Sequence, residues 1–203
     1  MAETDKKREL IIDGAIKRFI HYGINKTTMN EIAEDLSVSK PSLYYYFPDK
    51  TSLTLGVFEK IFDDYFQLLD KDQKSGSGIE SILLNIIEVK YRFFLRYYML
   101  HLSYGNPDSS ISSVELRSFL EKAFERNCKY HEHIFEQAMA NGEIAPQEDI
   151  AKIAELYLSC QSGLTSLCII HGNKELLPGK KEVKLMREKQ INLSKIFIKG
   201  LIK

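Results

Sequence analysis

The chain has 203 residues, of which 44% are hydrophobic, and its 28 basic and 28 acidic side chains give a formal net charge of zero. This size and apolar content suffice for one sizeable core or two smaller ones. No apolar run approaches the ~18 residues of a membrane span. The charged N-terminus lacks the apolar core of a signal peptide, so we expect a cytoplasmic protein. The zero net charge argues only weakly against nucleic-acid binding.

Loop-forming residues are few, since the chain contains 5 prolines and 11 glycines. Strand-like alternation is scarce, and apolar residues recur at the spacing of helices that bury one face. The sequence therefore predicts an all-α protein of about nine helices. Three cysteines without metal-binding spacing are expected to be reduced helical side chains: Cys128, Cys160 and Cys168.

The first expected helix covers residues 5–22 and ends at Gly23. Its predicted buried stripe consists of Ile12, Ala15, Ile16 and Phe19. The basic residues of this helix lie largely outside that stripe: Lys6, Lys7, Arg8, Lys17 and Arg18.

Two short helices joined by a tight turn are predicted between residues 27 and 50. Thr28 and Glu31 have capping-box spacing, which predicts the start of a helix that ends near Leu36. Ser39 is expected to cap the second helix, with Pro41 in its first turn, where a missing N–H costs nothing.

The second of these helices has one buried and one exposed side. Leu43 and Phe47 are four residues apart and therefore share a face, with Tyr46 beside them. The remaining side chains are expected to point away from the core: Lys40, Pro41, Ser42, Tyr44 and Tyr45. Asp49 is expected to cap a third helix.

This stretch resembles the signature of the tetracycline-repressor (TetR) family, which is approximately Thr-Thr, Ile-Ala, then V-S-x-x-x-L-Y-x-Y-F-x-x-K. One position departs from the pattern: Ser37 stands where the family usually has glycine, and it carries modest strain if the turn requires positive φ. The matching residues stand in register: Thr27-Thr28, Ile32-Ala33, Val38-Ser39, Leu43-Tyr44, Tyr46-Phe47 and Lys50.

The resemblance implies a helix–turn–helix module whose second helix enters the DNA major groove. Acidic residues balance the basic ones within the first 50 residues, so we expect hydroxyls and helix N-termini to carry much of the phosphate contact. The basic residues of the first helix have two readings, a solvated face or contacts with backbone phosphates. The expected groove contacts are Lys40, Pro41, Ser42 and Tyr44, the phosphate contacts are Thr28, Tyr46 and Lys50, and Tyr45 is a further DNA contact.

The rest of the chain is predicted to form a connector and a second helical domain. The long helix after Asp49 is apolar on two sides, as suits a connector, and a polar linker follows it. The expected domains are 1–48 for DNA binding, with 49–70 as connector helix, and 71–203 for ligand binding and dimerisation. The later helices are expected at 79–102, 113–141, 148–171 and 183–200, with a loop at 103–112.

In relatives of the family the second domain holds a small-molecule pocket whose ligand shifts the spacing of two DNA-binding heads. Aromatic side chains with a few polar groups are typical of ligand sites, although plain core is the alternative reading. We expect an apolar or aromatic ligand without a strong charge demand. The candidates are Phe62, Tyr65, Phe66, Tyr91, Phe94, Tyr98, His101, His131, Phe135, Tyr157 and Gln161.

The resemblance also implies a homodimer in which the last two helices pack against their copies. Two heads are needed for DNA half-sites about one turn, ~34 Å, apart. Packing within one chain is the alternative for the apolar stripe of the last helix. The candidate interface residues are Gly163, Leu164, Leu167, His171, Met186, Gln190, Leu193 and Phe197.

No enzyme signature, cofactor motif or metal site is predicted. The chain lacks a phosphate-binding glycine loop, a nucleophile elbow and an H-E-x-x-H motif. His131 and His133 are two residues apart on a helix, so they point in nearly opposite directions. We expect a ligand-responsive transcriptional repressor; the rival is a helical interaction protein that has kept this fold and lost operator binding.

Overall fold

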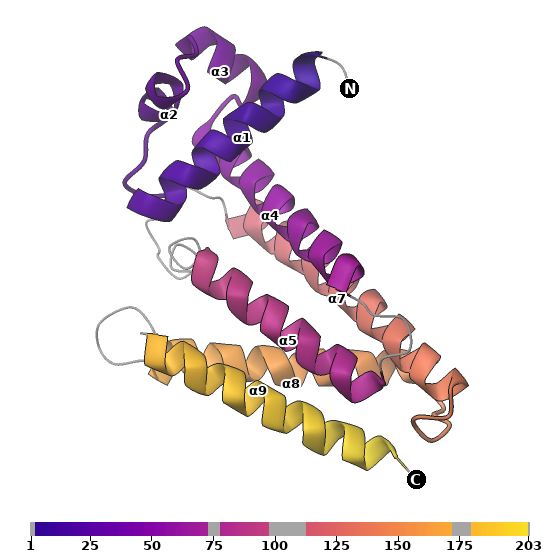
Figure 1. Ribbon diagram of the computed structural model, residues 1–203. Helices are drawn as coiled ribbons and strands as arrows, with labels where there is room; N and C mark the ends of the chain where they lie inside the picture. The colour runs from indigo at the N-terminus through magenta and orange to yellow at the C-terminus, as the bar shows by residue number, and fades with distance from the viewer. Residues whose placement is uncertain (1–2, 73–77, 98–112, 172–179, 203) are drawn as a thin grey trace. The chain divides into compact units, whose positions relative to one another are not determined.

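The computed structural model describes residues 3–72, 78–97, 113–171 and 180–202 (Figure 1). Over these residues it consists of eight helices without a strand, which confirms the predicted all-α class. None of these helices is long and apolar enough to cross a bilayer. The helices are α1 (Glu3–Tyr22), α2 (Met29–Asp35), α3 (Lys40–Tyr46), α4 (Lys50–Asp72), α5 (Ile79–Arg96), α7 (Ser113–Ala140), α8 (Ile150–His171) and α9 (Lys180–Leu201).

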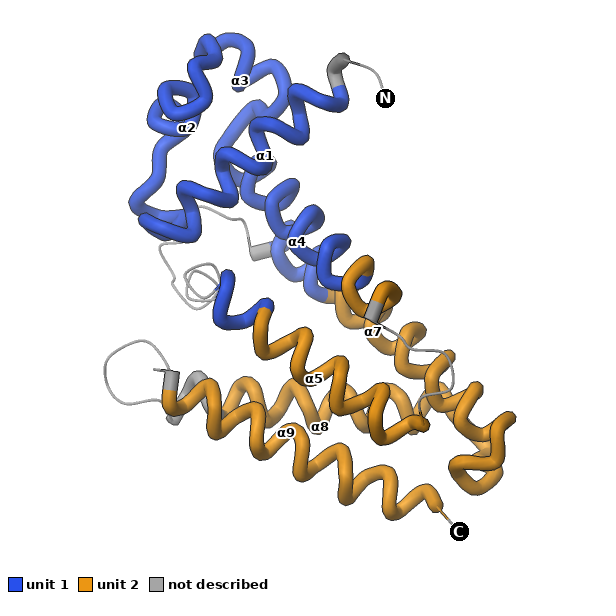
Figure 2. The backbone as a smooth tube through the Cα atoms, viewed as in Figure 1, with its two compact units in different colours: residues 1–66, 93–120 blue, residues 67–92, 121–203 orange. Residues whose placement is uncertain are grey.

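The chain divides into two compact units (Figure 2). Unit 1 contains residues 1–66 and 93–120, and unit 2 contains residues 67–92 and 121–203. Helices α4, α5 and α7 therefore contribute residues to both units. The functional boundaries expected from the sequence, at residues 48 and 71, remain a prediction.

The core of unit 1 forms where α1, α2, α3 and the first turns of α4 meet. On α1 the expected stripe is largely correct, although Ile11 is fully buried and Ile16 only half-buried. Gly14 lets α2 approach α1 closely, because a Cβ atom at this position would lie 2.6 Å from Leu36 Cδ2. The buried side chains of α1 to α4 hold α3 in its orientation. They include Phe19, Ile32, Leu43, Phe47 and Leu53.

In unit 2, α8 and α9 pack along each other (Figure 1). Their facing sides are buried at helical spacing, with Ala154, Tyr157 and Gln161 on α8. The corresponding stripe of α9 begins at Val183 and continues through Met186, Gln190, Ser194 and Ile198. Four of these buried side chains carry polar groups that hydrogen bonds must satisfy: Tyr157, Gln161, Gln190 and Ser194.

The loop after α7 is held at both ends by hydrogen bonds. Gly142 has φ of 74°, and the N–H of Glu143 donates to the Ala138 carbonyl at 2.9 Å, so the helix ends in a Schellman motif as expected for glycine at this position. The Glu143 carboxylate accepts from the Ile79 N–H at 2.6 Å and thus caps α5. The Ala145 N–H donates to the Leu201 carbonyl at 2.7 Å, which ties the loop to the end of α9.

Candidate functional site

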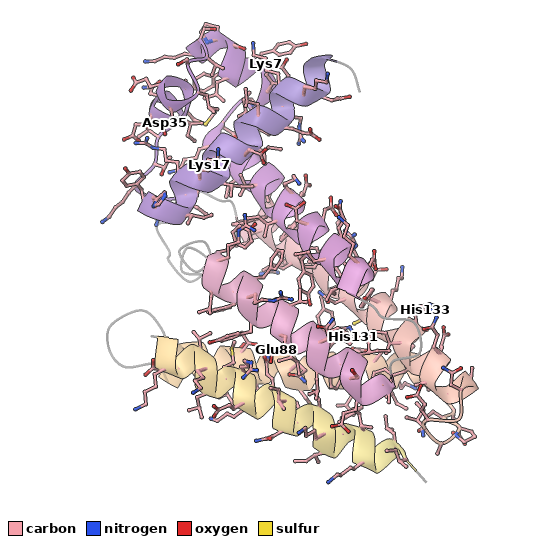
Figure 3. The ribbon with its side chains drawn as sticks, in the orientation of Figure 1. Lys7, Lys17, Asp35, Glu88, His131 and His133 are labelled. Carbon is pink, nitrogen blue, oxygen red and sulfur yellow. The ribbon has the colours of Figure 1, made fainter. Side chains whose placement is uncertain are left out.

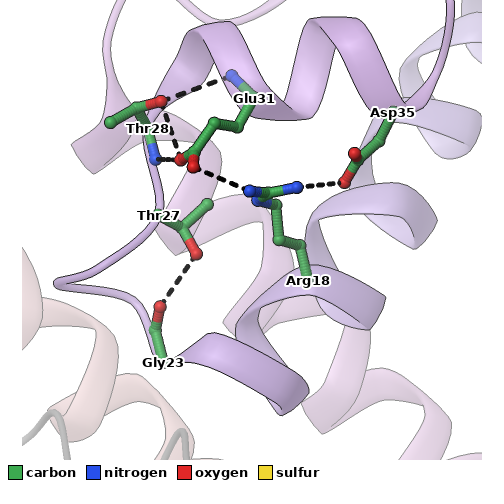
Figure 4. A network of polar contacts seen from close by, with 6 residues as sticks. All are labelled: Arg18, Gly23, Thr27, Thr28, Glu31 and Asp35. Atoms are coloured by element: carbon green, nitrogen blue, oxygen red, sulfur yellow. Dashed lines mark hydrogen bonds and ion pairs between the residues drawn. The ribbon is translucent and has the colours of Figure 1, made fainter.

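The start of α2 is a complete capping box (Figure 4). The Thr28 hydroxyl accepts from the Glu31 N–H at 3.3 Å, and the Glu31 carboxylate accepts from the Thr28 N–H at 2.8 Å and from its hydroxyl at 2.9 Å. These hydrogen bonds from Thr28, together with the Arg18 guanidinium, lower the pKa of Glu31. Both donors of Thr28 are thus bonded to Glu31, and a phosphate contact from Thr28 would require one of these bonds to be exchanged.

Arg18 joins α1 to α2 through two ion pairs (Figure 4). Its guanidinium lies 2.8 Å from Glu31 Oε1 and 2.7 Å from Asp35 Oδ2, and it stacks over the Tyr22 ring at 5.0 Å. The sequence grouped Arg18 with the other basic residues of α1, but its charge is neutralised by these carboxylates. Lys7 and Lys17, by contrast, project from α1 as exposed side chains (Figure 3).

The turn between α2 and α3 requires a positive φ. Ser37 has φ of 53° and is the one non-glycine residue in this region of backbone space among the described residues. The Ser37 N–H donates to the Glu34 carbonyl and the Val38 N–H to the Ala33 carbonyl, both at 3.0 Å. This is the same Schellman motif that ends α7, with serine in the place of Gly142. The sequence predicted modest strain at Ser37 if this turn requires a positive φ. The turn does require it, so Ser37 carries that strain.

Helix α3 is anchored on one side and exposed on the other. The Ser39 hydroxyl caps it by accepting from the Ser42 N–H at 3.3 Å, and Leu43 and Phe47 are buried in the core of unit 1. Tyr44 is 45% exposed and Tyr45 is 77% exposed. Lys40 and Pro41 are also exposed, whereas Ser42 and Tyr46 are half-buried. The anchored side thus holds two large aromatic rings and a lysine in fixed positions on the surface.

Lys50 lies at the first position of α4, close enough to Glu31 for the two charges to interact. Burial lowers the pKa of Lys50, and the negative charge of Glu31 opposes that effect. The start of α4 is capped as expected, because Asp49 Oδ1 accepts from the Ser52 N–H at 2.7 Å. Thr28, Glu31 and Lys50 therefore form one polar group beside the turn that leads into α4.

Four of the eleven ligand candidates come together in unit 2. The Tyr157 ring centroid lies 5.6 Å from that of His131 and 5.8 Å from that of Phe135. Gln161 Nε2 donates to the Tyr157 hydroxyl at 2.9 Å, and Phe197 of α9 stacks on the Tyr157 ring at 5.3 Å. These side chains are largely buried, so the Tyr157 cluster (His131, Phe135, Tyr157, Gln161 and Phe197) is the polar-aromatic centre of unit 2.

The other ligand candidates lie elsewhere. Tyr91 in unit 2 is covered by the Arg187 guanidinium at 5.4 Å, and Arg187 also pairs with Glu88 of α5. Tyr98 and His101 lie outside the described residues. Four candidates belong to unit 1, where Phe94 is buried and the others join an aromatic cluster with Phe93 and Phe119: Phe62, Tyr65 and Phe66. Whether any of these residues line a pocket remains a prediction.

A hydrogen-bond network lies between α8 and α9. The Tyr157 hydroxyl lies 2.7 Å from Ser194 Oγ, and Gln161 Nε2 lies 2.9 Å from the same oxygen. Gln190 Nε2 donates to the Gln161 carbonyl and to the Thr165 hydroxyl, both at 3.1 Å. Gln161 Oε1 is buried and has no hydrogen-bond partner among the described residues.

Several of the candidate dimer-interface residues lie in or beside this hydrogen-bond network. Met186 and Gln190 are buried within the single chain, and Phe197 packs against Tyr157, so these side chains stabilise the core of unit 2. Leu164 and Leu193 are half-buried, Gly163 and Leu167 are exposed, and the side chain of His171 lies outside the described part. Met186, Gln190 and Phe197 therefore follow the alternative of packing within one chain. A dimer role for the other interface candidates remains a prediction.

Sequence reasoning missed Lys90 of α5. Burial lowers the pKa of Lys90 to about 8. Its neighbour on α7 is His131, whose pKa is lowered to about 4 by burial and, to a smaller extent, by the charge of Lys90. His131 lies on the side of α7 toward α5, and His133 lies on another side of the helix (Figure 3). The sequence did contain a signal for this residue, because Lys90 falls at the helical spacing at which the other positions of this face of α5 are apolar.

Residues 11–57 match the family model described as "Bacterial regulatory proteins, tetR family". The HTH-type transcriptional regulator YuxN of Bacillus subtilis is 30% identical over 92 residues, which are 45% of this chain and 32% of YuxN. IcaR of Staphylococcus epidermidis, named a negative transcriptional regulator of the biofilm operon icaADBC, is 22% identical over 74% of this chain and 80% of its own length.

Solved structures resemble the whole chain. A transcriptional regulator from Cytophaga hutchinsonii superposes with a TM-score of 0.83 at 27% identity, covering 97% of this chain and 99% of its own. A tetR-family transcriptional regulator from Streptomyces coelicolor has a TM-score of 0.63 at 18% identity, over 97% of this chain and 80% of its own, and shows the shared fold alone. The relatives are named as regulators of transcription, in agreement with the expectation that the chain is not an enzyme.

Proposed function

Because the chain belongs to the TetR family of transcriptional regulators, we propose that it represses transcription by binding double-stranded operator DNA through α3. The observation that carries this proposal is the pair of exposed rings, Tyr44 and Tyr45, on a helix whose opposite side is anchored by Leu43 and Phe47. Lys40 and Pro41 stand beside them at the start of the helix, where base edges are contacted in such modules. The name of IcaR as a negative regulator supports repression.

Two copies of the chain bind one operator in this proposal, because two heads must reach two half-sites. The outward face of α8 offers Leu156 and Leu167, with the small residues Ser159 and Gly163 between them at helical spacing. Apart from the neighbouring backbone of α8 itself, no atom of the described residues lies within 4 Å of a Cβ at Gly163, which leaves room for a second helix to approach this face closely. The outward face of α9 offers exposed Leu185 and Ile196. These outward faces replace Met186 and Gln190 as the proposed interface.

A small ligand bound in unit 2 is proposed to release the protein from its operator. The support is the polar-aromatic composition of the Tyr157 cluster, which combines buried rings with hydrogen-bonding groups as ligand sites do. Ligand and DNA favour different states of the dimer, so each must lower the affinity for the other by the same factor.

The test is fluorescence anisotropy of the full chain on DNA from directly upstream of its own gene, with scrambled DNA of equal length as the control. Saturable binding to the first DNA alone, at two chains or a multiple per site, supports an operator-binding dimer. Equal weak binding to both, with no preferred site in a genome-wide selection of bound fragments, would favour the interaction-protein alternative. That second candidate is supported by the balanced charge of the chain.

A further inference from the structure

Arg8 of α1 lies against the carboxyl end of α3. Its guanidinium carbon is 5.2 Å from the centre of the Phe47 ring, within the ~6 Å range of a cation–π contact, and Phe47 is the C-cap residue of α3. The same guanidinium reaches Gly56 of α4, where a Cβ atom would lie 3.5 Å from Arg8 Nη2 and 3.1 Å from Phe47 Cε1. The absence of a side chain at Gly56 thus leaves room for the cation and the ring, and Arg8 joins α1 to both α3 and α4.

No carboxylate neutralises Arg8 within the described part of the chain. Arg8 is exposed, and its guanidinium makes neither an ion pair nor a hydrogen bond with the described residues. Arg18, ten residues later on α1, is by contrast paired with Glu31 and Asp35. The charge of Lys50 is likewise opposed by that of Glu31. Arg8 therefore presents an uncompensated positive charge beside the end of α3.

The contact with Phe47 orders the Arg8 side chain without using its hydrogen-bonding capacity. An aromatic ring attracts the charge of a guanidinium, whose five N–H donors can still bond to other groups. Two of these donors in parallel fit two oxygens of a phosphate or a carboxylate. Because the ring already holds the side chain, less conformational entropy is lost when an anion binds. Arg8 is thus prepared for an anion that no described residue supplies.

We propose that Arg8 binds a backbone phosphate of the operator, beside the expected phosphate contacts Tyr46 and Lys50. Phe47 follows Tyr46 directly and precedes Lys50 by three residues, so the guanidinium on its ring lies at the same edge of the DNA-binding module. Phosphates line the groove that a helix such as α3 enters, and they are the anions that this edge meets. This inference rests on the proposed operator binding and adds a contact from α1 to it.

The experiment measures the affinity of the full chain for the upstream DNA and for the scrambled DNA by fluorescence anisotropy at a series of salt concentrations. The proteins are the wild type, Arg8→Met, Arg8→Lys and Lys17→Met. Lys17 is the matched control, because it is an exposed cation nine residues further along α1, which places it on the opposite side of that helix (Figure 3). Arg8→Lys keeps the charge but not the planar fork of donors. Thermal melting verifies that each variant folds.

We expect Arg8→Met to bind both DNAs about tenfold or more weakly than the wild type, because it loses a charged hydrogen bond. The loss is the same for both sequences, since a phosphate contact carries no sequence information. The slope of log affinity against log salt should become shallower by about 1 per chain. Arg8→Lys should keep the wild-type slope at a lower affinity, and Lys17→Met should match the wild type in both.

The proposal is overturned if Arg8→Met keeps the wild-type slope, or if Lys17→Met loses as much of the slope as Arg8→Met does. A loss of affinity confined to the upstream DNA would also overturn it, because Arg8 would then act only by orienting α3. Failure of the proposed function is a separate result, in which the wild type does not prefer the upstream DNA. The effect of Arg8→Met on the slope is read in that case from both DNAs, since each carries the same phosphates.

Discussion

Leu36, the residue that caps the end of α2, lies directly on Gly14 of α1, so that a Cβ atom at Gly14 would be 2.6 Å from Leu36 Cδ2 and 2.9 Å from its Cγ. We expect Gly14→Ala to destabilise the protein by about 1–3 kcal/mol, because the added methyl group displaces the Leu36 side chain from its packed position. The free energy of unfolding by urea measures the effect. Gly200→Ala on α9 is the control, since a Cβ there meets nothing within 4 Å among the described residues and alanine favours a helix by about 0.5–1 kcal/mol. A Gly14→Ala protein as stable as the wild type would contradict this packing.

Ser37 occupies a left-handed backbone conformation in the turn that leads to α3. Glycine adopts this conformation without the clash of a Cβ atom, so Ser37→Gly should raise the free energy of unfolding by about 1 kcal/mol. Ser37→Ala keeps a Cβ atom and should bring no such gain, which makes it the matched control. Equal stability of the glycine and alanine variants would show that the turn stores no strain.

The helix–turn–helix was predictable from sequence because its signals are local. Capping residues such as Thr28 and Ser39, and the spacing of Leu43 and Phe47, act within a few residues of each other. The roles of Met186 and Gln190 were not predictable in this way. A stripe at helical spacing shows that one face of α9 is buried, but not whether its partner is α8 of the same chain or a second copy. The environment of Lys90 likewise depends on His131 of α7, which lies 41 residues later in the sequence.

Tyr44 is expected to contribute to operator binding without contributing to folding. Its ring is 45% exposed on α3, so Tyr44→Ala should leave the melting temperature nearly unchanged. We expect operator affinity to fall about tenfold or more in the anisotropy assay, since a ring contact with sugar or thymine methyl groups is lost. Tyr22→Ala is the control on α1, where a ring that is 57% exposed lies against the Arg18 guanidinium. Unchanged operator affinity would remove Tyr44 from the contact surface.

The salt dependence of operator binding tests how much of the contact is ionic. Each phosphate neutralised by a lysine or arginine contributes about −0.9 to the slope of log affinity against log salt. Lys40 is the one basic residue within α3, so Lys40→Gln should make the slope shallower by about 1 per chain. Lys129→Gln on α7 should leave the slope unchanged. We expect a shallow slope for the wild type; many released counterions per chain would contradict the hydroxyl-rich interface inferred from α3.

The buried imidazole of His131 should make the protein sensitive to acid. Burial lowers the pKa of His131 to about 4, below the value near 6.5 that it regains on unfolding, so the unfolded chain binds more protons between these values. The contribution of the neutral His131 imidazole to the free energy of unfolding is fully present above pH 6.5 and is lost as the pH falls toward 4. The loss from this residue is on the order of 3 kcal/mol, and urea unfolding at a series of pH values measures it.

Two variants separate His131 from the other acid-sensitive groups. His131→Phe should remove its share of the slope between pH 6.5 and 4, whatever its effect on stability at neutral pH. Lys90→Met should raise the pKa of His131 only part of the way toward its ordinary value, because burial lowers this pKa more than the charge of Lys90 does. Its slope should therefore lie between those of the wild type and His131→Phe, with the imidazole followed by NMR titration. An unaltered slope in His131→Phe would show that this imidazole is not held neutral inside unit 2.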